Sequence, residues 1–285
     1  MNDLEHDLRR VVEGEVRFDK MTRLLYATDA SMYQMEPIGV VIPRHAGDVQ
    51  AALEVANRQN VPILPRGGGT SLNGQTVNRA IVLDFSPHMN RVLEVNEAEG
   101  WARVEPGLVQ DELNAHVRPL GLLFGPDTST SNRATLGGMI GNNSGGAHSI
   151  AYGLTVEHVI ELTALLADGS RVVFGEVTPE VFRQKMQAAG LEGQVYREMA
   201  RIKEQYADEI RARYPKHWRR VCGYNLDELP KDRLLNMARL VVGSEGTLLT
   251  VVEAKVRLVR RPKKTARLPS ARRAVSSITC SSVRP

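Results

Sequence analysis

The chain has 285 residues, a net charge of +4 and two cysteines, Cys222 and Cys280. This length is enough for one or two domains with a substantial core. Two cysteines are too few for a disulfide framework or a structural zinc site, and no run of eighteen apolar residues predicts a transmembrane segment. The acidic N-terminus lacks a secretory signal, so we expect a cytoplasmic protein, either free or peripheral to the inner membrane.

The positive charge is concentrated at the C-terminal end. Residues 260–285 contain eight basic side chains and no acidic one, and subtracting these eight from +4 leaves −4 for the rest of the chain. A nucleic-acid site would combine basic with aromatic residues on a folded face, and this segment has no aromatic residue, so we expect no nucleic-acid partner. The low hydrophobicity and high charge predict a disordered basic tail over 263–285.

The first part of the chain predicts a small parallel sheet. After an N-terminal extension (1–34), the apolar run 39–42 predicts a strand, the periodicity of 46–59 a helix, and 61–64 a second strand. This β-α-β unit implies parallel pairing with a right-handed crossover. Residues 80–84 add a third strand, so we assign 35–90 to a first lobe whose strands are buried on both faces.

A glycine-rich stretch follows the second of these strands, Leu64-Pro65-Arg66-Gly67-Gly68-Gly69-Thr70-Ser71-Leu72-Asn73-Gly74-Gln75. Glycines permit positive φ and bring successive amides onto one side, which favours an anion site, and Arg66 adds a positive charge. The stretch lacks the lysine of a Walker loop and does not open a helix as a Rossmann fingerprint does. A glycine-rich hairpin remains the alternative interpretation.

The residues from 91 to 262 predict a second lobe built on an antiparallel sheet. Strands are predicted at 91–95, 101–105, 158–166 and 171–174, with a hairpin turn at 168–170. Helices are predicted at 108–117 and over most of 182–214, and the alternation of 248–258 predicts an edge or a central strand. The fold class is therefore α+β, with two lobes.

Two further glycine clusters follow in this second lobe. The first runs Gly125-Pro126-Asp127-Thr128-Ser129, continues through Thr135-Leu136-Gly137-Gly138 and ends at Asn142-Asn143-Ser144-Gly145-Gly146. The other is Gly243-Ser244-Glu245-Gly246-Thr247-Leu248. Together with Pro65-Arg66-Gly67-Gly68-Gly69-Thr70-Ser71, these ordered motifs resemble the PCMH-type FAD-binding domain of the vanillyl-alcohol oxidase / p-cresol methylhydroxylase superfamily, in its D-lactate dehydrogenase and glycolate oxidase branch. The resemblance covers residues 35–260.

The resemblance implies FAD as cofactor, held between the two lobes at the glycine segments. The residues that it implies at the cofactor are Pro65, Arg66, Gly67, Gly68, Gly69, Thr70, Ser71, Leu72, Asp127, Thr128, Ser129, Thr135, Gly137, Gly138, Asn142, Asn143, Ser144, Gly145, Gly243, Ser244, Glu245, Gly246, Thr247 and Leu248. Relatives that tether the flavin through the first loop have a histidine after the glycines, where this chain has Thr70. We therefore predict non-covalent FAD, with His148 as the alternative tether.

The resemblance also implies oxidation of a D-2-hydroxy acid, such as D-lactate, glycolate or D-2-hydroxyglutarate, by hydride transfer to the flavin. The electron acceptor is open: a quinone, a cytochrome, an iron–sulfur centre or an electron-transfer protein. No catalytic base is identified. The resemblance implies that family members continue past the last flavin strand into a substrate-binding cap domain, whereas the family pattern of this chain stops near 264–266. Our hypothesis is a truncated member with an out-of-frame tail. The alternatives are a catalytically incomplete FAD-binding fragment and a UDP-N-acetylenolpyruvylglucosamine reductase-like flavoenzyme.

The remaining polar residues predict no other site. The seven histidines do not fall at metal-ligand spacing, so no metal site is predicted. The basic segment 216–226 could face an anionic substrate, but a solvated turn with Trp218 and Tyr224 packed inward is favoured. Cys222 is expected to be a small buried residue rather than a nucleophile.

Overall fold

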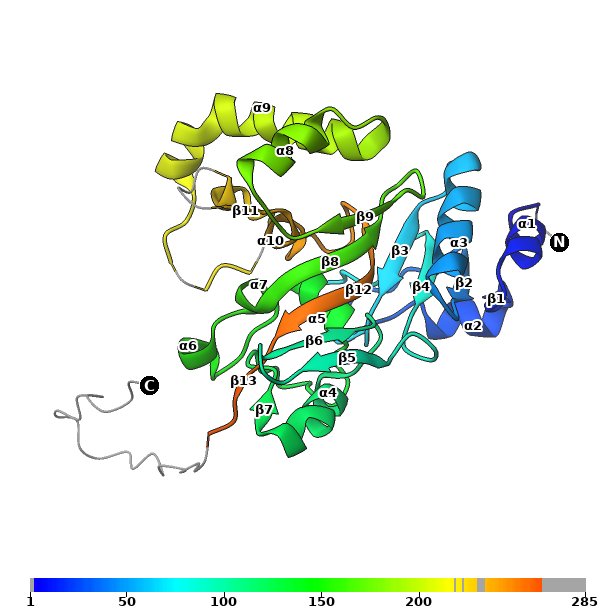
Figure 1. Ribbon diagram of the computed structural model, residues 1–285. Coiled ribbons are helices and arrows are strands. Elements are labelled where there is room, and N and C mark those ends of the chain that lie inside the picture. Colours follow the sequence, from blue (N-terminus) through cyan, green and yellow to red (C-terminus); the bar gives the residue numbers. More distant parts are fainter. Residues whose placement is uncertain (1–2, 218, 222, 230–233, 263–285) are drawn as a thin grey trace.

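The computed structural model describes residues 3–217, 219–221, 223–229 and 234–262, and it shows two lobes side by side (Figure 1). The predicted basic tail and residues Trp218 and Cys222 lie outside the described residues. The first lobe has a four-stranded sheet in the order β1-β2-β4-β3. Its elements are α1 (Asp3–Val11), β1 (Glu15–Arg17), α2 (Lys20–Leu25), β2 (Gly39–Ile42), α3 (Ala46–Arg58), β3 (Ile63–Arg66) and β4 (Ile81–Asp84).

The β-α-β unit forms, but its two strands are not neighbours. β2 and β3 both pair in parallel with β4, which lies between them. All four residues of β2 and of β4 are buried, as expected for strands covered on both faces. Strand β3 begins at Ile63 rather than Val61, because its register on β4 pairs Ile63 with Ile81 and Arg66 with Asp84.

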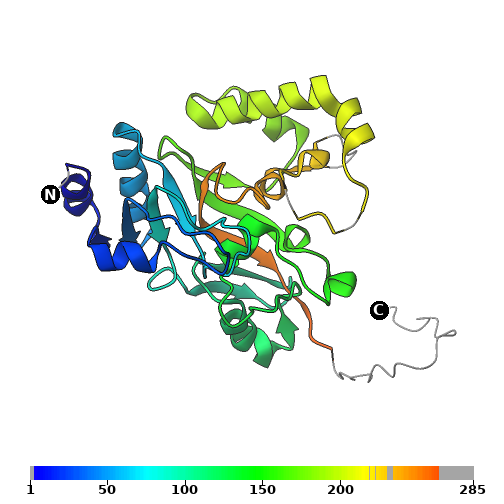
Figure 2. The same ribbon diagram turned by 180° about the vertical axis from the view of Figure 1, so that it is seen from behind.

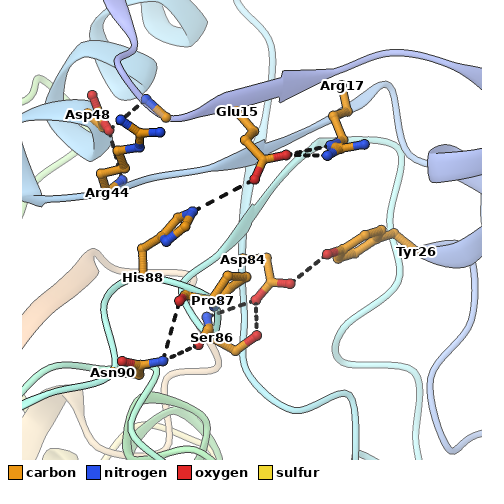
Figure 3. A network of polar contacts seen from close by, with 11 residues as sticks. Glu15, Arg17, Tyr26, Arg44, Asp48, Asp84, Ser86, Pro87, His88 and Asn90 are labelled. Atoms are coloured by element: carbon orange, nitrogen blue, oxygen red, sulfur yellow. Dashed lines mark hydrogen bonds and ion pairs between the residues drawn. The ribbon is translucent and has the colours of Figure 1, made fainter.

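The N-terminal residues complete this lobe rather than standing apart from it. β1 pairs antiparallel with β2, and α1 buries Leu4 and Leu8 in the cluster that includes Val49 and Leu53 of α3. The buried carboxylate of Asp48 accepts hydrogen bonds from the amides of Glu13, Gly14 and Arg44 at 2.8–3.1 Å. Figure 3 shows the contact between Asp48 and Arg44. The division at residue 35 therefore crosses a single sheet.

The second lobe is organised on a five-stranded antiparallel sheet in the order β5-β6-β12-β8-β9. β12 is the central strand, and its alternating burial reflects one face on the core and one face toward solvent. The strands are β5 (Val92–Asn96), β6 (Trp101–Val104), β7 (Leu122–Leu123), β8 (Val159–Leu165), β9 (Arg171–Phe174), β10 (Glu176–Val177), β11 (Leu235–Asn236), β12 (Thr250–Arg257) and β13 (Val259–Arg260). The short strands pair as β10-β11 and β7-β13.

Helices surround this sheet. They are α4 (Gln110–Val117), η1 (Arg118–Leu120), α5 (Leu136–Asn142), α6 (Ser149–Tyr152), α7 (Thr155–His158), α8 (Pro179–Met186), α9 (Gly190–Arg213), η2 (Leu226–Glu228) and α10 (Met237–Val241). In both views α8 and α9 lie beyond the edge strand β9 (Figures 1 and 2). The helix expected over 182–214 is two helices, because the chain breaks before Gly190, which has φ +75°.

The two lobes share buried side chains. Leu165 of β8 and Val252 of β12 belong to the same hydrophobic cluster as Ile81 and Leu83 of β4. The first sheet is thereby fixed relative to the second, which holds together the segments that form the candidate site.

Candidate cofactor-binding site

The three glycine segments meet at α5, a helix that the sequence did not predict. A Cβ on Gly67 of the first segment would lie 3.0 Å from the Cα of Gly138 in α5. In the third segment, the amide of Gly243 donates to the carbonyl of Ile140 at 2.9 Å. The amide of Glu245 donates to the carbonyl of Gly141, also at 2.9 Å. α5 is therefore the common support of all three segments.

The first segment is a crossover and not a hairpin. β3 and β4 are parallel neighbours. The chain must therefore return from Arg66, at one end of the sheet, to the opposite end, where β4 begins at Ile81. The hairpin interpretation is wrong for this reason. Gly68 is required by close packing, since a Cβ there would lie 2.2 Å from the carbonyl oxygen of Arg133.

The backbone amides of this segment are available to a ligand. Among the described residues, no amide from Gly68 to Leu72 donates a hydrogen bond to the protein. Gly69, Thr70 and Ser71 are half-buried, while Gly68 and Leu72 are exposed. A run of unpaired amides of this kind is a favourable site for an anion. This is the chemistry that a diphosphate requires.

The segments enclose a cavity of about 390 Å³. This volume falls within the range usual for ligand pockets. Most of the residues predicted at the cofactor line it: Pro65, Arg66, Gly67, Gly68, Gly69, Thr70, Ser71, Leu72, Thr128, Ser129, Thr135, Gly137, Gly138, Asn142, Ser144, Gly145, Ser244, Glu245 and Gly246. Five predicted residues do not line this cavity: Asp127, Asn143, Gly243, Thr247 and Leu248.

Two of these five hold neighbouring loops together. Asn143 is buried with φ +50°, accepts a hydrogen bond from the amide of Val156 at 3.0 Å and donates to the carbonyl of Arg220 at 3.3 Å. Asp127 accepts from the amide of His148 at 3.1 Å, and its Oδ2 lies 2.8 Å from His148 Nδ1. The structure therefore gives both side chains a positioning role beside the cavity.

The third segment reaches the cavity only in part, although all six of its residues were predicted at the cofactor. Its amides at Gly243, Ser244, Glu245 and Thr247 all donate to protein carbonyls, so they are not available as a second anion cradle. Thr247 and Leu248 line a separate apolar groove of about 230 Å³. Only Ser244 to Gly246 of this segment reach the main cavity.

Several lining residues were missed by the sequence analysis. They are Asn73, Gln75, Thr76, Phe85, Pro106, Thr130, Ala134, Met139, Ile140, Gly141, Val241, Leu249 and Val251. Many are apolar, so the lining combines hydrophobic side chains with the polar glycine segments. Phe85 directly follows β4 and Pro106 closely follows β6, so the ends of these strands could have indicated them.

Gln110 supports the second segment from behind and was also missed. Its buried side chain donates to the carbonyl of Pro126, and it lies 3.0 Å from the hydroxyl of the cavity-lining Thr128. Since Gln110 is the first residue of α4, this helix fixes the position of the segment.

Arg66 does not direct its charge into the cavity. Its guanidinium donates to the backbone carbonyls of Tyr26, Thr28 and Thr76 at 2.8–3.1 Å and lies over the Tyr26 ring. Burial lowers the pKa of Arg66 from its ordinary value. The expectation that this side chain supplies positive charge to the ligand is therefore not met by its geometry.

The basic segment after α9 is also tied into the fold. Arg220 pairs with Asp227 at 2.5 Å and lies over the ring of Tyr214. Tyr224, expected to pack inward, is half exposed, and its hydroxyl lies 2.8 Å from the hydroxyl of Thr247. Among the described residues, no three His, Cys, Asp or Glu side chains gather as a metal site.

The chemistry of the site fits FAD. Unpaired amides at Gly68–Leu72 suit the diphosphate, and the apolar lining residues, Phe85 and Val251 among them, suit a ring system. The carbonyl oxygen of Arg133 beside Gly68 leaves no room for a side chain at that point of the cradle. These are the features expected of an FAD-binding site.

Comparison with known proteins agrees with this class. Residues 37–175 match the FAD binding domain family, which indicates FAD as the cofactor of this part of the chain. The chain is 41% identical over 254 residues to a D-2-hydroxyglutarate dehydrogenase from Pseudomonas putida, with 88% of this chain covered. It is 33% identical over 257 residues to the glycolate oxidase subunit GlcD from Bacillus subtilis, again with 88% covered.

The chain spans only part of these relatives. It covers 25% of the Pseudomonas putida protein and 44% of the Bacillus subtilis subunit. Among solved structures, an alkyldihydroxyacetonephosphate synthase superposes with a TM-score of 0.64 at 20% identity, covering 93% of this chain and 42% of that one. A 6-hydroxy-D-nicotine oxidase from Arthrobacter nicotinovorans gives 0.58 at 17% identity, covering 87% and 43%. At these identities the structural likeness supports the fold alone.

The sequence predicted no transmembrane segment, and the helices can be compared with that prediction. None of the helices in the described part of the chain combines the length and the apolar character needed to cross a bilayer.

Proposed function

We propose that the chain is the FAD-binding part of an oxidoreductase that acts on a D-2-hydroxy acid, with D-2-hydroxyglutarate as the first substrate to test. The single observation that carries this proposal is the cavity at which three glycine segments meet on α5, with unpaired amides at Gly68–Leu72. The identity to D-2-hydroxyglutarate dehydrogenases supports the substrate class.

The residues of this chain would bind and orient the cofactor. The amides of Gly68–Leu72 would hold the diphosphate, and the apolar lining residues, Phe85 and Val251 among them, would exclude water from a ring. A flavin held there would supply an acceptor for the hydride of the substrate's carbinol carbon. We place no base for the hydroxyl proton on a described residue.

An anaerobic titration tests the proposal. Purified protein loaded with FAD is scanned near 370 and 450 nm, roughly where oxidised flavins absorb, after addition of D-2-hydroxyglutarate, D-lactate or glycolate. Bleaching by glycolate, or by the D- and not the L-enantiomer of the two chiral acids, supports the proposal. Binding of FAD without bleaching identifies a catalytically incomplete FAD-binding part, and bleaching by NADPH instead identifies a reductase of the UDP-N-acetylenolpyruvylglucosamine type.

A further inference from the structure

We infer that Arg66 is a positioning residue for the cofactor, which fastens residues 26–33 across the outer side of the glycine segment and thereby fixes the amides of Gly68–Leu72. We name residues 26–33 the strap. The inference rests on the proposed role of these amides in holding the diphosphate, and it goes beyond that role by assigning the arginine to the loop rather than to the ligand.

The guanidinium of Arg66 donates hydrogen bonds to backbone carbonyls of two separate segments of the chain. Nη1 donates to the carbonyl of Tyr26 at 3.1 Å and to that of Thr76 at 3.0 Å, and Nη2 donates to the carbonyl of Thr28 at 2.8 Å. Two of these acceptors belong to the strap, and the third, Thr76, directly follows the glycine segment. A planar group with five fixed donors can bridge three carbonyls in this way, whereas the single ammonium of lysine presents no such fork.

The strap touches the glycine segment at further points. The amide of Ala30 donates to the carbonyl of Gly69 at 3.0 Å, and Asp29 accepts from the hydroxyl of Thr76 at 2.9 Å. Gly69 has φ +65°, and a Cβ there would lie 2.8 Å from Arg66 Nη2. The arginine head therefore lies directly against the turn whose amides we assign to the diphosphate.

The same group is anchored to the end of the first sheet. The Tyr26 ring lies under the guanidinium at 5.3 Å, and its hydroxyl donates to Asp84 Oδ2 at 2.6 Å (Figure 3). Asp84 ends β4 directly opposite Arg66 in the parallel register, and its other oxygen accepts from the amide and hydroxyl of Ser86 at 2.9 and 2.7 Å. Strap, loop and sheet edge thus form one connected network around Arg66.

This geometry argues against direct contact with the diphosphate. A guanidinium that turned toward the cavity would leave three carbonyls without their donor and would lose its contact with the Tyr26 ring. Preorganised amides need no such rearrangement when the ligand arrives, which favours binding.

Amide hydrogen exchange of the FAD-free protein tests this role independently of the cofactor. Arg66→Met is expected to accelerate exchange at least tenfold in both the strap and residues 68–76, with Arg66→Lys intermediate. Arg79→Met is the matched control, because Arg79 is an exposed arginine in the chain leading to β4, and it should leave both segments unchanged.

FAD affinity at two salt concentrations separates positioning from direct contact. Arg66→Met should weaken FAD binding at least tenfold, by the same factor at 50 mM and 500 mM salt, since the lost element is loop order and not an ion pair with the ligand. Tyr26→Leu retains the charge of Arg66, and it should also accelerate amide exchange and weaken FAD binding. This variant replaces Arg66→Met as the test if Arg66→Met does not fold.

Unchanged exchange in Arg66→Met, with an affinity loss that fades at high salt, would overturn the inference and make Arg66 a diphosphate ligand. If the unmodified chain binds no FAD, the proposed function fails, and the exchange rates still decide whether Arg66 orders the loop.

Discussion

Gly67 lies so close to Thr135 that a Cβ on the glycine would sit 2.7 Å from the threonine Oγ1. That oxygen cannot move away freely, because it accepts a hydrogen bond from the amide of Gly138. Thr135 is thereby the N-cap of α5. The contact joins the first glycine segment to the helix that supports the other two.

Gly67→Ala is therefore expected to destabilise the fold by about 1–3 kcal/mol, the usual cost of overpacking, and to weaken FAD binding at least tenfold. Urea denaturation and fluorescence titration with FAD measure the two effects. Gly175→Ala is the control, because a Cβ there meets its nearest atom at 3.5 Å, an ordinary contact. Equal stability and equal FAD affinity in the two variants would show that neither the fold nor FAD binding requires the close approach of Gly67 to α5.

The sequence predicted which residues form strands better than it predicted which strands pair with each other. The strands at 39–42, 80–84, 101–105 and 171–174 were recognised because their apolar residues follow a strong local pattern. The insertion of β4 between β2 and β3 was not, since parallel order depends on where the crossover returns and not on any local pattern.

α5 was missed for a physical reason. Its sequence, Leu-Gly-Gly-Met-Ile-Gly-Asn, has three glycines in seven residues, and glycine is a poor helix former. The helix forms because Thr135 caps it and because the missing side chains let the glycine segments pack against it. The composition that hides the helix from a propensity argument is the one that makes the site.

The N-terminal residues depend on Asp48 in a way that local sequence does not reveal. Asp48 is 1% exposed and accepts from three amides, two of them more than thirty residues away in sequence. Asp48→Ala is expected to lower the free energy of unfolding by about 2–3 kcal/mol, because three amides lose a charged acceptor. Denaturant melts measure it, and Glu54→Ala on the exposed side of α3 should change stability by no more than about 0.5 kcal/mol.

The charge of Asp29 in the strap is expected to make the stability of the protein depend on pH. Burial raises the pKa of Asp29, but hydrogen bonds from Ser31 and Thr76 outweigh it, and the net pKa lies below its ordinary value. A lowered folded-state pKa contributes stability that is present above the unfolded value, about 3.9, and is lost as the pH falls through the folded value.

Wild type should therefore be more stable than Asp29→Asn at pH 7, and the difference should shrink as the pH falls below about 4. Thermal melts across this range measure it. Asp208→Asn, at an exposed carboxylate of α9, is the control and should show little difference at either pH. A difference that grows on acidification would contradict the role of the Asp29 charge.

The cofactor is expected to be released by acid. Thr70 stands where tethering relatives have a histidine, and the side chain of His148 is 73% exposed, held by Asp127 and absent from the cavity lining. Acid precipitation of the FAD-loaded protein should leave yellow flavin in the supernatant. His148→Ala should release flavin to the same extent. Flavin retained in the wild-type pellet and released by His148→Ala would instead identify a bond to His148.

Tyr196 carries a buried hydroxyl whose removal should stabilise the protein. The side chain of Tyr196 is fully buried, its ring meets Phe174 and Phe182 edge to face, and among the described residues no group hydrogen-bonds its hydroxyl. Burial, together with the nearby charge of Glu192, raises the pKa of Tyr196 to about 12, so the hydroxyl stays neutral at ordinary pH.

Tyr196→Phe keeps both aromatic contacts and removes a desolvated polar atom, so we expect a gain of about 1–2 kcal/mol in the free energy of unfolding. Tyr206→Phe, on the exposed face of the same helix, should change stability by less than about 0.5 kcal/mol. Urea denaturation of the three proteins compares them directly. Loss of stability in Tyr196→Phe would mean that the hydroxyl has a partner, such as a buried water, and that α9 is held to β9 by a polar contact as well as by aromatic packing.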